Sequence, residues 1–266
     1  MPTPRPFATA LATALPILSS SRWMRDWAAR LPFDIELGPY KLGVEWRERE
    51  RLLDRRRRAC IDLEGARIEL RNDLSGMALA RAFLGSVIRL AHYSKGCQQG
   101  CVEEAYTHSF ATGLVEFAQR NPRAWLWFNL LLAEHLPGRP RFDQAVRGVP
   151  MRPPRLPDCI DIAGRVVAVR CISRRETGSA FGWYDPQRRE VQLYVGLSGT
   201  NLPVVALHEI THAVHHAYAV KMRDTHRNFN HAQLDGWLAI VRSNPAMWLW
   251  LAWAMSYPEA ASLAQR

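Results

Sequence analysis

The stretch LSGTNLPVVALHEITHAVHH, residues 197–216, decides the fold because the chain contains a second version of it. An upstream segment, LSGMALARAFLGSVIRLAHY (74–93), aligns with it without gaps at an offset of 123 residues. At the same offset, NPRAWLW (121–127) falls on NPAMWLW (244–250). Self-similarity at a fixed spacing indicates repeated structural units, so we infer an internal duplication.

The duplication divides the 266-residue chain into four parts. We expect an N-terminal arm at 1–29, a first unit at 30–137, a linker at 138–154 and a second unit at 155–266. The linker is assigned from its richness in proline and arginine. Two similar units in one chain commonly pack like the subunits of an isologous dimer, so a pseudo-twofold pair is predicted.

Each unit reads as a few strands followed by about three helices, which is an α+β fold. Strand-like runs are YKLGVEW (40–46) and GARIEL (65–70) in the first unit, and RVVAVRCI (165–172) and REVQLYV (189–195) in the second. An LSG turn then opens a long helix with apolar periodicity. A second helix ends before Asn-Pro, because proline cannot continue the hydrogen-bond ladder, and a Trp-rich helix follows.

The second unit carries the motif HEITH (208–212) inside its first long helix, with Pro203 in the first helical turn. Four residues make about 1.1 helical turns, so both imidazoles project from one face toward one point. This spacing favours a Zn²⁺ ion bound by His208 and His212. Glu209 is then expected to act as the general base that takes a proton from a water molecule.

The first unit has no equivalent of this motif. Gly85, Ser86 and Arg89 stand where the second unit has the two histidines and the glutamate. The helix can therefore be built without these side chains, so packing does not explain their presence. We predict that the second unit alone binds the metal, and that the first is a degenerate scaffold or substrate platform.

The third metal ligand is expected from the next helix, where two histidines compete. His231 follows His212 by 19 residues, and Asp235 comes one turn later, where it can hold the second nitrogen of that imidazole as a partner. His226, 14 residues after His212, is the alternative. The histidine that does not bind the metal could donate to the oxyanion of a tetrahedral intermediate.

The ALHEITHAVHH helix, preceded by a strand, resembles the zincin zinc metallopeptidases. The spacing of His231 and Asp235 resembles the thermolysin-type gluzincin arrangement, with His in place of a Glu ligand, whereas the position of His226 resembles that in SprT-like proteases. The resemblance implies a zinc-dependent endopeptidase that acts on a protein or peptide substrate. It also implies that strand 189–195 is the sheet edge along which an extended peptide pairs.

The net charge of +10 is concentrated partly in RERERLLDRRRR (47–58), which is typical of a solvated helix face or loop. The second interpretation is a surface for DNA or another acidic partner. The alternative to a peptidase is therefore a nucleic-acid- or protein-binding regulatory protein with a structural or vestigial zinc site. Both hypotheses predict a folded chain, since 48% of its residues are hydrophobic and 23% are charged.

The cysteine count and the apolar runs bear on the cellular compartment. Five cysteines, an odd number, do not suggest a disulfide scaffold and favour reduced thiols in a cytoplasmic protein. The apolar run near the N-terminus is interrupted by Thr and Pro, so it fits an arm better than a secretory signal. AMWLWLAWAM (246–255) is too short to span a bilayer, and no membrane span is predicted.

Overall fold

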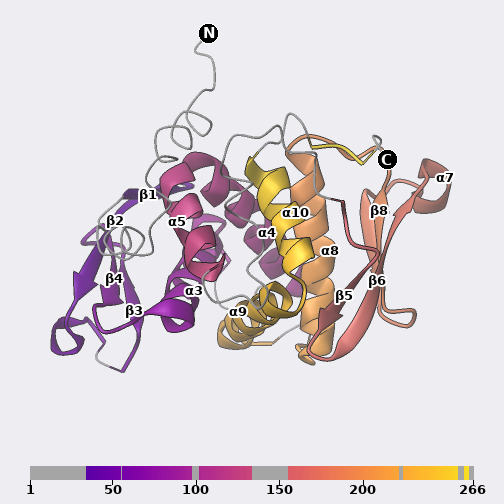
Figure 1. Cartoon of the computed structure of the whole chain (residues 1–266). Helices are drawn as coiled ribbons and strands as arrows, with labels where there is room; N and C mark the ends of the chain where they lie inside the picture. The colour runs from indigo at the N-terminus through magenta and orange to yellow at the C-terminus, as the bar shows by residue number, and fades with distance from the viewer. Residues whose placement is uncertain are drawn as a thin grey trace, which may run out of the picture. The chain divides into compact units, whose positions relative to one another are not determined.

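The structure, a computed structural model, describes residues 34–54, 56–97, 102–133, 155–221, 224–256 and 261–263. Within these residues the chain forms the same series of strands and helices twice (Figure 1). The predicted N-terminal arm (1–29) and linker (138–154) lie outside the described residues.

The two copies share the order of their main elements. The first copy contains β1 (Asp34–Leu37), β2 (Tyr40–Arg47), a short 3-10 helix (Arg49–Arg51), β3 (Ala59–Asp62), β4 (Arg67–Arg71), α3 (Gly76–Ser94), α4 (Glu103–Arg120) and α5 (Pro122–Ala133). The second contains β5 (Cys159–Ile162), β6 (Arg165–Ile172), the short α7 (Arg174–Thr177), β7 (Gly182–Asp185), β8 (Glu190–Tyr194), α8 (Asn201–Ala217), α9 (His226–Ser243) and α10 (Pro245–Ser256).

Each copy forms one four-stranded sheet, and the two sheets have the same topology. The strand orders are β1-β2-β4-β3 and β5-β6-β8-β7, with a parallel central pair and antiparallel outer pairs. The predicted duplicated α+β fold is thus confirmed. The expectation that strand 189–195 forms a sheet edge is wrong, because β8 lies between β6 and β7. The edge on that side is β7, whose four residues give a weak sequence pattern.

The duplicated Asn-Pro pairs have the same role in both copies. The side-chain amide of Asn244 donates to the backbone oxygen of Asp161, and its oxygen accepts from the backbone N–H of Asp161, at 2.6 and 2.8 Å. Asn121 makes the same two bonds to Glu36 in the first copy, at 2.7 and 2.6 Å. The asparagine therefore fixes each helix-helix junction to the first strand of its sheet, and the following proline begins the last helix.

Two equivalent glycines allow the two long helices of each copy to cross closely. A Cβ atom on Gly113 would lie 2.4 Å from Cβ of Ala91, and one on Gly236 would lie 2.3 Å from Cγ1 of Val214. Any side chain at either position would push the helices apart. This contact explains why both glycines recur at the offset of the duplication.

The compact units of the chain do not coincide with the two copies. Val87–Glu116, which contains the end of α3 and most of α4, belongs to the same unit as the second copy, and the remaining described residues of the first copy form the other unit. Within the second unit, Tyr106 of α4 stacks on Phe229 of α9, with ring centroids 4.4 Å apart. The second unit therefore contains helices from both copies.

Helix α8 lies between the second sheet and α9, and the sequence of its buried face explains this position (Figure 1). Leu207, Ile210 and Val214 are fully buried at the helical spacing of three to four residues. Thr211, inside the HEITH motif, accepts a hydrogen bond from Nε1 of Trp237 on α9 at 3.1 Å. This packing directs the opposite face of α8 toward α4.

Among the described helices, none combines the length and apolarity needed to cross a membrane. The arginine-rich segment 47–58 contains several local ion pairs, including Arg51 with Glu48 at 3.2 Å and Arg57 with Asp54 at 2.8 Å. These acids neutralise part of the run, and a role for it in binding DNA or another acidic partner stays a prediction.

Candidate metal centre

Helix α8 places His208 and His212 side by side on the face directed toward α4. Their Nε2 atoms lie 3.1 Å apart, and the ring planes are nearly perpendicular, at 76°. Both rings are half-buried. Burial lowers the pKa of His208 to about 4, although the charge of Glu104 opposes this shift. His208 is therefore neutral near pH 7, which is the form that binds a metal.

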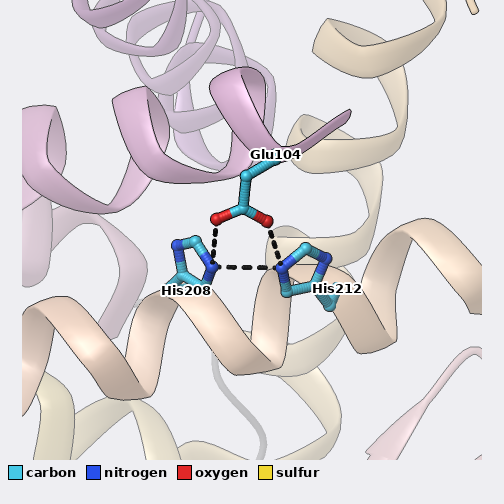
Figure 2. Close-up of side chains that lie close together, drawn as sticks. All are labelled: Glu104, His208 and His212. Atoms are coloured by element: carbon cyan, nitrogen blue, oxygen red, sulfur yellow. Dashed lines mark hydrogen bonds and ion pairs between the residues drawn. The ribbon is translucent and has the colours of Figure 1, made fainter. Parts of the chain in front are cut away.

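The third group at this point is Glu104, from the start of α4 in the first copy. One carboxylate oxygen lies 3.1 Å from Nε2 of His208 and the other lies 3.2 Å from Nε2 of His212. Figure 2 shows the carboxylate reaching from α4 toward both rings on α8. Both helical segments belong to the same compact unit.

The spacing of these atoms is compatible with a metal ion. Ligand atoms about 2.0–2.2 Å from a tetrahedral Zn²⁺ ion are about 3.3 Å apart. The two Nε2 atoms are 3.1 Å apart, each lies 3.1 to 3.2 Å from a different oxygen of Glu104, and one ligand atom from each residue lies within 4.8 Å of the others. Among the described residues these three alone form a group of metal-ligating side chains with converging atoms. Three protein ligands leave the fourth position of a tetrahedral site open. This is the arrangement of catalytic zinc sites, whereas structural zinc sites have four protein ligands.

Glu103, next to Glu104, fixes the orientation of the His212 ring. Its carboxylate lies 2.9 Å from Nδ1 of His212 and 3.0 Å from Nδ1 of the buried His215. Burial raises the pKa of Glu103, but the hydrogen bonds from both histidines outweigh this effect and bring it to about 2. An ionised carboxylate only accepts, so Nδ1 of His212 carries the proton. In the neutral ring Nε2 of His212 then has the lone pair that a metal needs. Burial lowers the pKa of His212, but the hydrogen bond and charge of Glu103 outweigh this effect and raise it, so a metal must displace a proton from this ring at low pH.

Glu209 lies on the side of α8 that faces β7. It is only 8% exposed, and this burial raises the pKa of its carboxyl to about 7, while a hydrogen bond from the backbone N–H of Tyr184 opposes the shift. Gly182 makes room for the side chain, since a Cβ atom there would lie 2.8 Å from Cγ of Glu209. In the first copy, Ala59 and the smaller Ser86 occupy the equivalent positions.

A cavity of about 780 Å³ opens beside these groups. Its wall includes the candidate ligands, Glu209, β7 and the C-terminal end of α8. Trp183 of β7 contributes an apolar surface and is 61% exposed. The cavity is large enough to hold a small molecule or a segment of a peptide.

The other residues predicted for the site lie elsewhere in the second unit. His226 begins α9, with Nδ1 3.1 Å from the hydroxyl of Tyr106 and Nε2 2.8 Å from Nδ2 of Asn230. His231 is an exposed residue of α9, and Asp235 follows one turn later. Neither histidine belongs to the converging group. In the structure Glu104, rather than His231 or His226, lies beside His208 and His212, and the identity of a third metal ligand stays a prediction.

Glu103 and Glu104 were not among the predicted site residues, because a third ligand was sought only in the second copy. At the offset of the duplication they correspond to His226 and Arg227 at the start of α9. The sequence analysis therefore looked to α9 of the second copy, whereas Glu103 and Glu104 lie at the start of α4, the equivalent helix of the first copy. The adjacent acids at the start of α4, where α9 has none, were the available sequence signal.

No family model matches the chain, and no curated protein or solved structure matches it either.

Proposed function

We propose that the protein is a zinc-dependent peptidase that hydrolyses peptide bonds. The observation that supports this function is the convergence of three ligand atoms from Glu104, His208 and His212 beside a buried carboxylate, Glu209, at the wall of a cavity. A structural metal site needs neither the open fourth position nor the adjacent base.

The residues of the chain divide the chemistry among them. Zinc held by Glu104, His208 and His212 would act as a Lewis acid and lower the pKa of water. Glu209 accepts the proton from the attacking water and delivers it to the leaving amine. The backbone N–H of Tyr184 holds the carboxylate of Glu209 in place, and Glu103 holds the ring of His212.

Strand β7 provides the backbone groups that would align an extended peptide. The N–H of Tyr194 donates to the oxygen of Phe181, and the antiparallel register pairs Trp183 with Gln192. Hydrogen-bonded pairs alternate along an antiparallel ladder, so the backbone groups of Gly182 and Tyr184 point away from β8. Because the N–H of Tyr184 bonds to Glu209, the groups offered to a peptide are the N–H and C=O of Gly182 and the C=O of Tyr184. This edge lies along the base, which suits a substrate that adds a strand to the sheet.

The proposal is tested on the purified full-length chain. We expect about one zinc per chain by elemental analysis and slow hydrolysis of unfolded casein. Removal of the metal with 1,10-phenanthroline should abolish the hydrolysis, and added zinc should restore it. Absence of a stoichiometric transition metal, or hydrolysis that the chelator does not change, would overturn the proposed function.

Gly182 offers a test of the position of the base. In Gly182→Ala the new methyl group would contact Cγ of Glu209 and Cγ1 of Val205, at 2.8 and 2.7 Å before relaxation, so the carboxylate must shift. Because a displacement of about 1 Å can cost about 100-fold in rate, we expect casein hydrolysis to fall by about 10- to 100-fold with zinc content unchanged.

The matched control for this change is Gly43→Ala. Gly43 lies in β2 of the first sheet, and a Cβ atom there would approach nothing closer than 3.9 Å. This variant should retain full activity. An active Gly182→Ala protein would show that Glu209 does not need its observed position.

We also propose that the two copies are related by a pseudo-twofold axis. Tyr106 and Phe229, which are equivalent at the offset of the duplication, stack on each other. Contact between equivalent residues is expected at a twofold axis. An experimental structure in which one copy superposes on the other by a rotation far from 180° would contradict this arrangement.

A further inference from the structure

The two copies differ systematically at the positions that line the cavity. His208, Glu209 and His212 replace Gly85, Ser86 and Arg89 of the first copy, as the proposed chemistry requires. Two more replacements, however, serve neither the metal nor the base. On α8, His216 stands where the first copy has Tyr93, and on β7, Tyr184 stands where it has Ile61.

These two residues contact each other. The hydroxyl of Tyr184 lies 2.9 Å from Nδ1 of His216, and the two rings are 5.8 Å apart between centroids. Tyr184 is 8% exposed, whereas His216 is exposed and forms part of the cavity wall. The hydroxyl of a buried tyrosine therefore holds an exposed imidazole at the cavity. The fold does not require such a pair, since the first copy has Ile61 and Tyr93 at these positions.

The direction of this hydrogen bond determines which nitrogen of a neutral His216 ring carries the proton. Burial raises the pKa of Tyr184, so its hydroxyl keeps its proton and is able to donate to Nδ1 or to accept from it; we assign the hydroxyl as the donor. In a neutral imidazole whose Nδ1 accepts a hydrogen bond, the proton is on Nε2. His216 then presents an N–H donor to an acceptor oxygen of a ligand in the cavity.

The position of His216 along α8 sets the distance between this donor and the metal ligands. The midpoint of His208 and His212 is six residues before His216, which corresponds to about 9 Å at 1.5 Å per residue. An extended peptide advances about 3.3 Å per residue. The donor is therefore about three residues from the point where a carbonyl would react.

We infer that His216 is a substrate-binding residue, oriented by Tyr184, which donates a hydrogen bond to a carbonyl or carboxylate oxygen about three peptide residues from the scissile bond. This inference rests on the proposed function, because it assumes that the reacting carbonyl group of the substrate lies at the metal. It assigns to the protein a preference for substrates that extend along α8.

The inference is tested with two hydroxamic acids of the same chain length and the zinc-loaded full-length protein. Octanohydroxamic acid ends in a methyl group, whereas the monoamide monohydroxamate of suberic acid ends in a primary amide with an acceptor oxygen. Since a net hydrogen bond is worth about 0.5–1.5 kcal/mol and 1.4 kcal/mol is tenfold in affinity, we expect the amide to bind about two- to tenfold more tightly in calorimetry.

Four variants separate the contribution of His216 from that of the metal. His216→Leu should lose the preference for the amide and bind octanohydroxamic acid as the unchanged protein does. His216→Gln, which keeps a donor, should retain part of the preference, and Tyr184→Phe, which frees the ring, should reduce it. His231→Leu, a change of an exposed histidine outside the cavity wall, should have no effect.

The possible outcomes distinguish the two proposals. Equal binding of both hydroxamates to the unchanged protein, or an amide preference that survives in His216→Leu, overturns the role of His216 and leaves the metal site standing. Failure to bind zinc or either hydroxamate overturns the proposed function, and the inference falls with it.

Discussion

The Glu209→Gln protein is expected to bind zinc normally and to lose casein hydrolysis by about 100- to 10,000-fold, the usual contribution of a general base. The amide keeps the size of the side chain, so the contact with Gly182 is preserved, but it cannot accept a proton. Hydrolysis rates and zinc content measured on the same preparation separate loss of the base from loss of the metal.

The control for this variant is Glu190→Gln. Glu190 lies in β8 of the same compact unit and is also 8% exposed, but it is not part of the cavity wall. Its substitution tests the effect of neutralising a buried carboxylate near the site, and activity should persist. Activity that also persisted in Glu209→Gln would remove this residue from the mechanism.

Substitution of Glu104 by alanine is expected to weaken zinc binding by more than about 100-fold. Loss of a partner that only orients a ligand already costs about 10- to 100-fold in affinity, and this change removes a proposed direct ligand. Glu104 is largely exposed, so the change should leave the fold intact. Competition with a chromophoric chelator measures the affinity.

The same titration on His231→Ala and His226→Ala decides between the two ligand assignments. Both variants should bind zinc like the unchanged protein, because neither imidazole joins the converging group. If His231→Ala lost zinc and Glu104→Ala kept it, the assignment based on sequence spacing would hold and the one based on the structure would fall.

The fold was largely predictable because the duplication makes each copy a check on the other. Recurrent Gly113 and Gly236 mark the helix crossings, and recurrent Asn-Pro marks the last junction of each copy. The short edge strands β3 and β7 were not predicted as separate elements. Four residues carry too little periodicity, and their position at the edge depends on pairing between distant segments.

The candidate site was predictable only where its residues are close in sequence. His208, Glu209 and His212 share one helix, so their spacing alone places them together. Glu104 lies more than a hundred residues upstream, and it reaches the two histidines because α4 packs with the second copy. The contact of Tyr184 with His216 likewise joins a strand to a helix, which local spacing cannot indicate.

If Glu104 binds the metal as proposed, the contribution of α4 makes the first copy necessary, although it does not carry the motif. A shortened protein that began after the linker would contain HEITH but neither Glu103 nor Glu104. Deleting or exchanging the upstream half would therefore be as damaging to activity as mutating the motif itself. If the chain is the proposed peptidase, selection on its single site would act on both halves of the gene after the duplication, and neither half would be an enzyme by itself.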